Sequence, residues 1–350
     1  MRVAIDARGV HSRLQGVGRN VLNLLLGLSH KESDLEFIVI YNDPLARKLV
    51  ERSGGPYRGR FQWVKSMAGV GHLMERVEIP WLLKIHKASL FHDIGCSGVW
   101  TANIPIVTTV HELAPERDTE KMRRALRDST LIVAVSYSVA DEIESRLNMS
   151  RPKIRIISNA VDPFYTERVP ENEVRAMRER FKLPAKYFLC VTADRPSKNP
   201  EIVKRIAAQW AGPEQWVFTM KGTDNQKCRY LDIVEDAWLR PLYSASTALI
   251  APSHYEGFSL PPIEALSSGT VPIVSDIPPH REALGDVLLE ELFFNPTSDT
   301  ALERALWAVL NGSDVMRTAV VERFRNVNHR YSVVETAIQM QAVYREVLKG

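Results

Sequence analysis

The sequence of 350 residues has few cysteines and no long apolar run. Its three cysteines, Cys96, Cys190 and Cys228, lie far apart and form no C-x-x-C pair, a pattern that favours free thiols in a reducing compartment. No stretch reaches the ~18 apolar residues that a membrane-crossing helix needs, and Asp6 interrupts the apolar N-terminal stretch. We therefore expect a cytoplasmic chain with neither a signal peptide nor a transmembrane helix.

Motifs for metals and for NAD-type cofactors are also missing. The sequence has no D-x-D tripeptide, and its nine histidines form no H-E-x-x-H, so we expect no metal ion and no cofactor. Val21 occupies the third glycine position of a dinucleotide fingerprint, which argues against an NAD site. Gly16 and Gly18 remain, and glycines before a helix let backbone amides approach a phosphate closely. A purely structural glycine turn is the alternative.

Charge is divided unevenly along the chain. The net charge is +3, yet residues 1–165 carry 23 Lys and Arg against 18 Asp and Glu, while the remainder is slightly acidic. Six cations between residues 47 and 65 are interleaved with Tyr57, Phe61 and Trp63: Arg47, Lys48, Arg52, Arg58, Arg60 and Lys65. Such a segment is most often solvent-exposed, and docking on an anionic membrane is the alternative. We expect no nucleic-acid partner.

Short β-branched runs alternate with helical stretches, which predicts parallel sheets covered by helices on both faces. Length alone predicts two domains of roughly 150 to 200 residues. The expected linker is 162–174, with two prolines and several charges, and Ser138 is the expected N-cap of a helix. The expected strands are 2–6, 36–41, 61–64, 106–110, 131–135, 154–157, 187–192, 216–220, 248–251 and 271–274, and the clearest helices are 18–28, 138–147, 200–210 and 301–310.

The most informative stretch is residues 251–269, APSHYEGFSLPPIEALSSG, which reads as a strand end, a loop, a helix and a stop. Pro261 and Pro262 suit the first helical turn, and Gly269 suits the position after the helix end. The loop therefore directs backbone amides and a helix N-terminus toward a ligand, a suitable site for a diphosphate. Glu264 lies in an otherwise small and apolar helix, where a carboxylate needs a partner such as a pair of hydroxyls.

Within this stretch, Glu256 and Glu264 form the E-x7-E element of the retaining nucleotide-sugar glycosyltransferases of family 4, which the sequence resembles over essentially its whole length. The resemblance implies a GT-B fold: two Rossmann-like α/β domains that face a cleft, with the C-terminal helix crossing back to the N-terminal domain. The implied acceptor domain is residues 1–165 with helix 333–350, and the implied donor domain is residues 166–332. Segments that carry the resemblance elsewhere are VAIDARGVHSRLQGVGRNVLNLL, PIVTTVHELAPER, LIVAVSYSVADEI, IRIISNAVDPFY, YFLCVTADRPSKNPEIV and YSVVETAIQMQAVYREVL.

The resemblance also implies roles for individual residues. Glu256 would contact hydroxyls of the donor sugar, Glu264 would bind the ribose, and His111 would lie by the donor sugar and the acceptor hydroxyl. The sequence has SKN where the family commonly has PRKN, so Lys198 is a better phosphate ligand than Arg195. The donor diphosphate would be held by Arg195, Lys198, the amides of Gly257, Phe258, Ser259 and Leu260, and the glycine loop with Gly16 and Gly18. Packing or surface roles are the alternatives for His111, Arg195 and Lys198.

These roles imply transfer of a hexosyl group with retention and without a metal, because cations and fixed amides can stabilise a departing nucleoside diphosphate. The expected donor is a nucleotide sugar, with GDP-mannose slightly favoured over a UDP-sugar. The expected acceptor is a glycan or lipid-linked saccharide of surface polysaccharide or lipopolysaccharide biosynthesis, reached from the inner face of the membrane. The alternatives are a catalytically silent partner subunit and a sugar-nucleotide epimerase on the same fold.

Overall fold

The computed structural model describes residues 1–11, 16–70, 72–98, 103–113, 120–312 and 314–349, and the chain divides into two compact units. The first unit comprises Met1–Ala160 with Arg330–Gly350, and the second comprises Val161–His329. Parts of two segments quoted above, residues 12–15 and 114–117, lie outside the described residues. No helix of the described chain combines the length and the hydrophobicity that a membrane span requires.

The first unit contains a parallel sheet of seven strands in the order β3-β2-β1-β4-β5-β6-β7. The order reverses between β1 and β4, as in a Rossmann fold, and ligands of such sheets bind beyond the carboxyl ends of the strands at this switch point. The strands are β1 (Arg2–Asp6), β2 (Glu36–Tyr41), β3 (Phe61–Lys65), β4 (Leu90–Asp93), β5 (Ile106–Val110), β6 (Leu131–Ala134) and β7 (Ile154–Ile156). The helices of this unit are α1 (Val17–His30), α2 (Leu45–Arg52), α3 (Glu75–Ile85), α4 (Glu120–Asp128), α5 (Tyr137–Leu147) and α13 (Val333–Lys349).

The second unit repeats this architecture with six parallel strands in the order β10-β9-β8-β11-β12-β13, so its switch point lies between β8 and β11. Its strands are β8 (Tyr187–Cys190), β9 (Gln215–Phe218), β10 (Cys228–Tyr230), β11 (Ala248–Ala251), β12 (Pro272–Ser275) and β13 (Phe293–Phe294). Its helices are α6 (Glu171–Phe181), α7 (Pro200–Gln209), α8 (Asp236–Ala245), α9 (Leu260–Ser267), α10 (Pro278–Leu284), α11 (Asp299–Asn311) and α12 (Asp314–Val327).

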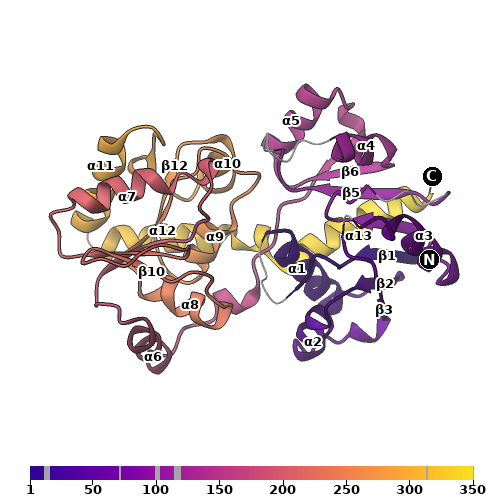
Figure 1. Cartoon of the computed structure of the whole chain (residues 1–350), viewed down its shortest axis with the longest axis horizontal. Coiled ribbons are helices and arrows are strands. Elements are labelled where there is room, and N and C mark those ends of the chain that lie inside the picture. The colour runs from indigo at the N-terminus through magenta and orange to yellow at the C-terminus, as the bar shows by residue number, and fades with distance from the viewer. Residues whose placement is uncertain (12–15, 71, 99–102, 114–119, 313, 350) are drawn as a thin grey trace. The chain divides into compact units, whose positions relative to one another are not determined.

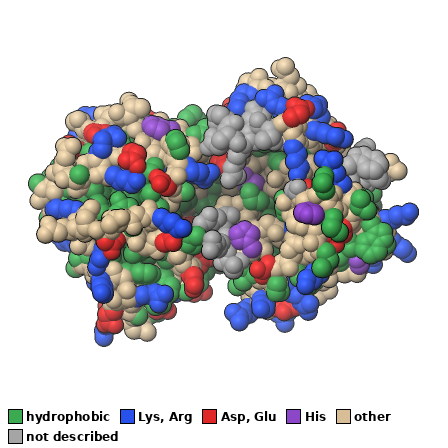
Figure 2. Space-filling model, in the orientation of Figure 1, with side chains coloured by type: hydrophobic (Ala, Val, Ile, Leu, Met, Phe, Trp, Pro, Cys, Tyr) green, Lys and Arg blue, Asp and Glu red, His purple; other side chains and the backbone are tan. Residues whose placement is uncertain are grey.

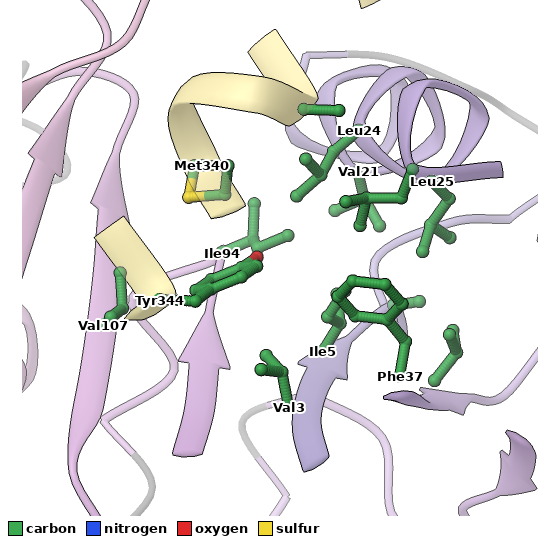
Figure 3. Close-up of a cluster of buried hydrophobic side chains, with 14 of the residues drawn as sticks. Val3, Ile5, Val21, Leu24, Leu25, Phe37, Ile94, Val107, Met340 and Tyr344 are labelled. Atoms are coloured by element: carbon green, nitrogen blue, oxygen red, sulfur yellow. The ribbon is translucent and has the colours of Figure 1, made fainter. Parts of the chain in front are cut away.

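The C-terminal helix α13 packs on the first unit, although the second unit separates them in sequence (Figure 1). Its apolar residues, among them Met340 and Tyr344, join the core formed by β1, β2 and α1, as Figure 3 shows. Gly27 of α1 lies directly beneath α13, since a Cβ atom at this position would be 1.9 Å from the carbonyl oxygen of Val333. The expected crossing of the C-terminal helix back to the N-terminal domain is therefore confirmed.

A buried histidine ties α13 to the sheet. His92 on β4 is fully buried, and its ring nitrogens lie 2.7 Å from the Tyr344 hydroxyl and 2.8 Å from the Thr109 hydroxyl. Burial, with a smaller contribution from the charge of His111, lowers the pKa of His92 from 6.5 to about 3. The folded chain thus holds His92 neutral over a pH range in which the unfolded chain protonates it.

His92 predicts a specific loss of stability in acid. Because the unfolded state binds the proton below the ordinary pKa and the folded state does not, stability falls as pH drops from about 6.5 toward 3, by about 2 kcal/mol at pH 5 for this group alone. His92→Gln removes the titration, so the free energy of unfolding should fall less for the variant than for the wild type between about pH 7.5 and pH 5. Urea unfolding at the two pH values measures this, and equal losses would contradict the role of His92.

The structure corrects several expectations about single elements. Strands β4, β10 and β13 were not expected from the sequence. The N-cap of α5 is Ser136 rather than Ser138, because the Ser136 hydroxyl accepts a hydrogen bond of 3.1 Å from the amide of Val139. The expected linker 162–174 contains a 3₁₀ turn over Pro163–Thr166 and the first residues of α6, so much of it is ordered secondary structure.

The basic segment between residues 47 and 65 is partly built into the core of the first unit. Phe61 is buried with its ring centroid 5.7 Å from that of Phe37, and the half-buried Trp63 packs edge-on against Tyr41 at 6.0 Å. These two aromatic side chains therefore pack within the first unit, and docking of this segment on an anionic membrane stays a prediction.

Candidate functional site

The two loops at the switch point of the second sheet are joined by hydrogen bonds. One follows β8 and the other follows β11, which are neighbouring strands. The amides of His254 and Tyr255 donate to the carbonyl oxygen of Ser197 at 2.9 and 3.2 Å. The Asn199 side chain donates to the carbonyl oxygen of Pro252 at 3.0 Å. Residues that are more than fifty positions apart in sequence are thereby fixed beside one another.

Lys198 and Glu256 meet between these loops. The Nζ of Lys198 lies 2.5 Å from Oε2 of Glu256, and the two side chains are only 17% and 11% exposed. The second carboxylate oxygen, Oε1, accepts a hydrogen bond of 2.7 Å from the Ser253 hydroxyl. A pair so shielded from solvent needs these hydrogen bonds to offset its desolvation, and the result is a positive and a negative group held in a defined geometry.

Further hydrogen bonds fix the position of Ser253, the hydrogen-bond partner of Glu256. The Ser275 hydroxyl at the end of β12 donates to the carbonyl oxygen of Ser253 at 2.5 Å, and Nδ1 of His280 lies 2.8 Å from the carbonyl oxygen of Ser275. His280 is fully buried, which lowers its pKa even though the charge of Glu256 acts to raise it. Ser253, Ser275 and His280 were not predicted from the sequence. Ser275, at the end of the strand beside β11, was a sequence signal that could have pointed to this part of the site.

The N-terminus of α9 begins at this loop as expected. Ser259 precedes the helix in a left-handed conformation, with φ 72° and ψ 84°, which is unusual for a residue other than glycine. Because Pro261 and Pro262 have no N–H group, the N-terminus of α9 can offer only the amides of Ser259 and Leu260 to a ligand. The side chain of Phe258 is buried and belongs to the packing of this unit.

Glu264 lies in α9 and is 3% exposed. The hydroxyl of Tyr243, on α8, donates a hydrogen bond of 2.8 Å to Oε2 of Glu264. The hydroxyl of Tyr243 thus satisfies part of the hydrogen-bonding capacity of this buried carboxylate, and its binding of ribose hydroxyls stays a prediction. Arg195, at the start of the turn that carries Lys198, is half-buried, and among the described residues no carboxylate lies within ion-pair distance of it.

The remaining expected residues belong to the first unit. Gly16 has a φ of +47°, which favours glycine, and a Cβ at Gly18 would be 2.7 Å from the carbonyl oxygen of Gly9. Both glycines are therefore required by the local backbone, whether or not a phosphate binds there. His111 follows β5 and is half-buried, with Nε2 3.1 Å from the carbonyl oxygen of Ile94.

The first unit has a cavity of about 590 Å³ at its own switch point, lined by residues after β1 and after β4 together with Asn42 and residues of the segment 67–70. Its floor includes the buried Arg8, which pairs with Asp6 at 2.7 Å and with Glu75 at 3.2 Å. Although burial acts to lower the pKa of Arg8, the hydrogen bond and charge of Asp6, with those of Glu75, raise it. This cluster of Arg8, Asp6 and Glu75 was not predicted from the sequence.

The two halves of the chain match two families. Residues 14–164 match Glycosyltransferase Family 4, and residues 175–326 match Glycosyl transferases group 1. The O-antigen chain mannosyltransferase RfbU of Salmonella typhimurium strain LT2 is 30% identical over 216 residues, which are 57% of this chain and 55% of that protein. The O-antigen chain mannosyltransferase B of Escherichia coli is 27% identical over 220 residues, 56% of this chain and 54% of that protein. The matched part thus spans about half the length of these curated relatives.

Solved structures share the fold at low sequence identity. HepE of Anabaena, solved with UDP and glucose, has a TM-score of 0.78 at 13% identity, with 99% of this chain and 100% of that chain covered. WaaG, a glycosyltransferase involved in lipopolysaccharide biosynthesis, has a TM-score of 0.67 at 13% identity, with 97% and 99% covered. The two Rossmann-like units are those of a GT-B fold, as expected from the sequence.

Proposed function

Since this chain joins a Glycosyltransferase Family 4 domain to a Glycosyl transferases group 1 domain, we propose that it transfers a hexosyl group from a nucleotide sugar to a glycan or lipid-linked saccharide acceptor. The observation that carries this proposal is the shielded Lys198–Glu256 pair at the switch point of the second sheet. The reaction serves the synthesis of lipopolysaccharide or another surface polysaccharide at the cytoplasmic face of the membrane, a role supported by the similarity to O-antigen chain mannosyltransferases.

The second unit binds the donor in this proposal. Lys198 and Arg195 contribute positive charge to the diphosphate, and the amides at the start of α9 contribute fixed dipoles, so the leaving group is stabilised without a metal. Glu256 orients Lys198 and binds hydroxyls of the donor sugar, while Glu264, held by Tyr243, accepts the ribose hydroxyls. GDP-mannose is the proposed sugar donor, because the relatives are mannosyltransferases.

Transfer proceeds with retention and without a covalent enzyme intermediate. A phosphate oxygen of the donor accepts the proton of the acceptor hydroxyl on the face from which the nucleoside diphosphate departs, so the protein contributes positioning and electrostatics. The first unit binds the acceptor, with His111 beside the reacting hydroxyl and the cavity next to Arg8 and Asn42 as the place for its saccharide.

Nucleotide binding tests the proposed function. With EDTA present, GDP should raise the thermal unfolding midpoint by several degrees, because a ligand at about 100 times its Kd stabilises the folded state by ~2.7 kcal/mol. Glu264→Gln should weaken this shift, since the neutral amide keeps the Tyr243 hydrogen bond but binds ribose hydroxyls less strongly. The exposed Glu201→Gln is the matched control and should behave as wild type.

The nucleotide series separates the possible outcomes. A shift with UDP alone would retain the proposed transfer reaction but replace GDP-mannose with a UDP-sugar. No shift with GDP, UDP or ADP would overturn the proposed function and favour a silent partner subunit. An unchanged GDP shift in Glu264→Gln would contradict the ribose role of this residue.

A further inference from the structure

The exposed apolar side chains of this protein are concentrated on and around α3. Among the described residues, seven of the thirteen large hydrophobic side chains that are exposed lie between residues 67 and 85. Val77, Trp81 and Ile85 follow one another at intervals of four along α3, so they form one stripe on the helix, and they are 75%, 57% and 46% exposed. Leu73, in the turn that precedes the helix, is 75% exposed and continues the same four-residue spacing. An apolar stripe of this length on a surface helix indicates an interaction site.

The packing of α3 fixes which face is turned outward. Ile79, Leu82 and Leu83 are buried against the sheet of the first unit. The two acidic residues of the helix are also turned inward. Glu75 is buried beside Arg8, and Glu78 accepts hydrogen bonds of 2.7 and 2.6 Å from the amides of residues 67 and 68. The stripe is therefore held in place by a rigid scaffold rather than exposed by local fraying.

The charge beside the stripe has a single sign. Arg76, Lys84 and Lys87 are exposed, and residues 73–87 contain no acidic residue other than the two that face inward. Figure 2 shows hydrophobic and basic side chains gathered next to one another at the end of the first unit where Figure 1 places α3. Apolar side chains flanked by cations, with a tryptophan among them, match the interface of a bilayer that contains anionic lipids.

We propose that α3 docks this chain on an anionic membrane, with Leu73, Val77, Trp81 and Ile85 inserted among the lipids and the three cations at the headgroups. This proposal rests on the proposed function, in which the acceptor is a lipid-linked saccharide. Met67 and Val70 continue the apolar surface from α3 to the lining of the cavity assigned to that acceptor. A membrane at α3 would bring the head of a lipid-linked saccharide to that cavity. The docking surface is thus α3 rather than the basic segment 47–65.

Vesicle binding by the full chain tests the proposal. Wild type should sediment with vesicles of phosphatidylcholine containing about one third phosphatidylglycerol, and bind vesicles of phosphatidylcholine alone about tenfold more weakly. Val77→Ser with Trp81→Ser should lower binding to the mixed vesicles by about tenfold or more. Lys84→Glu with Lys87→Glu should remove the preference for anionic lipid. Val315→Ser, which changes an equally exposed apolar residue on α12, is the matched control and should bind as wild type.

The possible outcomes separate the membrane proposal from the proposed transfer function. Mixed-vesicle binding that survives both double variants, or no binding by wild type, overturns the membrane proposal. A self-association that Val77→Ser with Trp81→Ser abolishes, seen by sedimentation without vesicles, would instead assign the stripe to a second copy of the chain. The nucleotide-induced thermal shift should be the same in all these variants, so loss of docking leaves the proposed function standing, whereas docking without any nucleotide shift overturns only the proposed function.

Discussion

Replacing Glu256 with glutamine is expected to lower the turnover number for glycosyl transfer by roughly 10²–10⁴-fold, with a much smaller effect on nucleotide affinity. Glutamine has nearly the same size and can still accept the Ser253 hydrogen bond, but it lacks the charge that holds Lys198 at 2.5 Å. The ammonium group then loses its fixed position, and the donor sugar loses a charged hydrogen-bond acceptor. Both losses act more strongly on the transition state than on the bound nucleotide.

The same substitution at two other glutamates, Glu201 and Glu264, provides the comparison for Glu256→Gln. Glu201→Gln changes an exposed ion pair with Lys204 and should leave kcat unchanged. Glu264→Gln should act mainly on the nucleotide affinity. If Glu256→Gln keeps kcat within about threefold of wild type, while its thermal unfolding midpoint is also unchanged, the Lys198–Glu256 pair is a structural ion pair and its proposed role is wrong.

Replacing Gly27 with alanine is expected to destabilise the chain by about 2 kcal/mol or more, although alanine is the better helix former by ~1 kcal/mol. The added Cβ would lie 1.9 Å from the carbonyl oxygen of Val333 and 2.6 Å from its carbonyl carbon. Since these are backbone atoms of α13, no rotamer change relieves the contact, and the helix must move away from the core that Met340 and Tyr344 help to form.

The direction of the stability change decides this test, because helix propensity alone would make Gly27→Ala stabilising. Gly59→Ala is the control, because a Cβ at that position meets no atom within 4 Å. The measurement is the thermal unfolding midpoint, and a change of roughly 2 kcal/mol corresponds to a drop of several degrees. A midpoint that stays constant or rises in Gly27→Ala would show that α13 packs on α1 less closely than the 1.9 Å approach to Val333 implies.

The sequence predicted the elements around the proposed site better than the contacts between them. The strand, loop and helix around Glu256 follow from local signals, namely a buried strand, two prolines at a helix start and a glycine at its end. The Lys198–Glu256 contact was not predictable in this way, because it depends on β8 and β11 being neighbours. The contribution of Ser275 and His280 depends in addition on β12, so it emerges only from the tertiary structure.

One of the three unexpected strands, β4, has polar residues at buried positions. β4 reads Leu90-Phe91-His92-Asp93, and its two polar residues hide it from a search for apolar runs. Tertiary partners compensate for them: the Tyr344 and Thr109 hydroxyls for His92, and the amides of residues 97 and 98 for Asp93. Those amides lie close by in sequence, but the hydroxyl of Tyr344 is brought by α13, which no local pattern could indicate.

The proposed docking surface on α3 was also not predictable from the sequence. Cations interleaved with aromatic residues pointed to the segment 47–65, but Phe61 and Trp63 are required by the core. The stripe on α3 also contains apolar residues at helical spacing, and a sequence pattern cannot tell whether such a stripe is buried or exposed. Here the other face of α3, with Ile79 and Leu82, fills the core, and the stripe is left outside.

The most direct test of the central claim is a transfer assay with GDP-mannose radiolabelled in the sugar, a lipid-linked saccharide acceptor and EDTA. We predict that wild type transfers the label to the acceptor with retention of anomeric configuration, as read by NMR of the product, and that Glu256→Gln does so far more slowly. No transfer from GDP-mannose or any UDP-sugar, or equal rates for wild type and Glu256→Gln, would contradict the account.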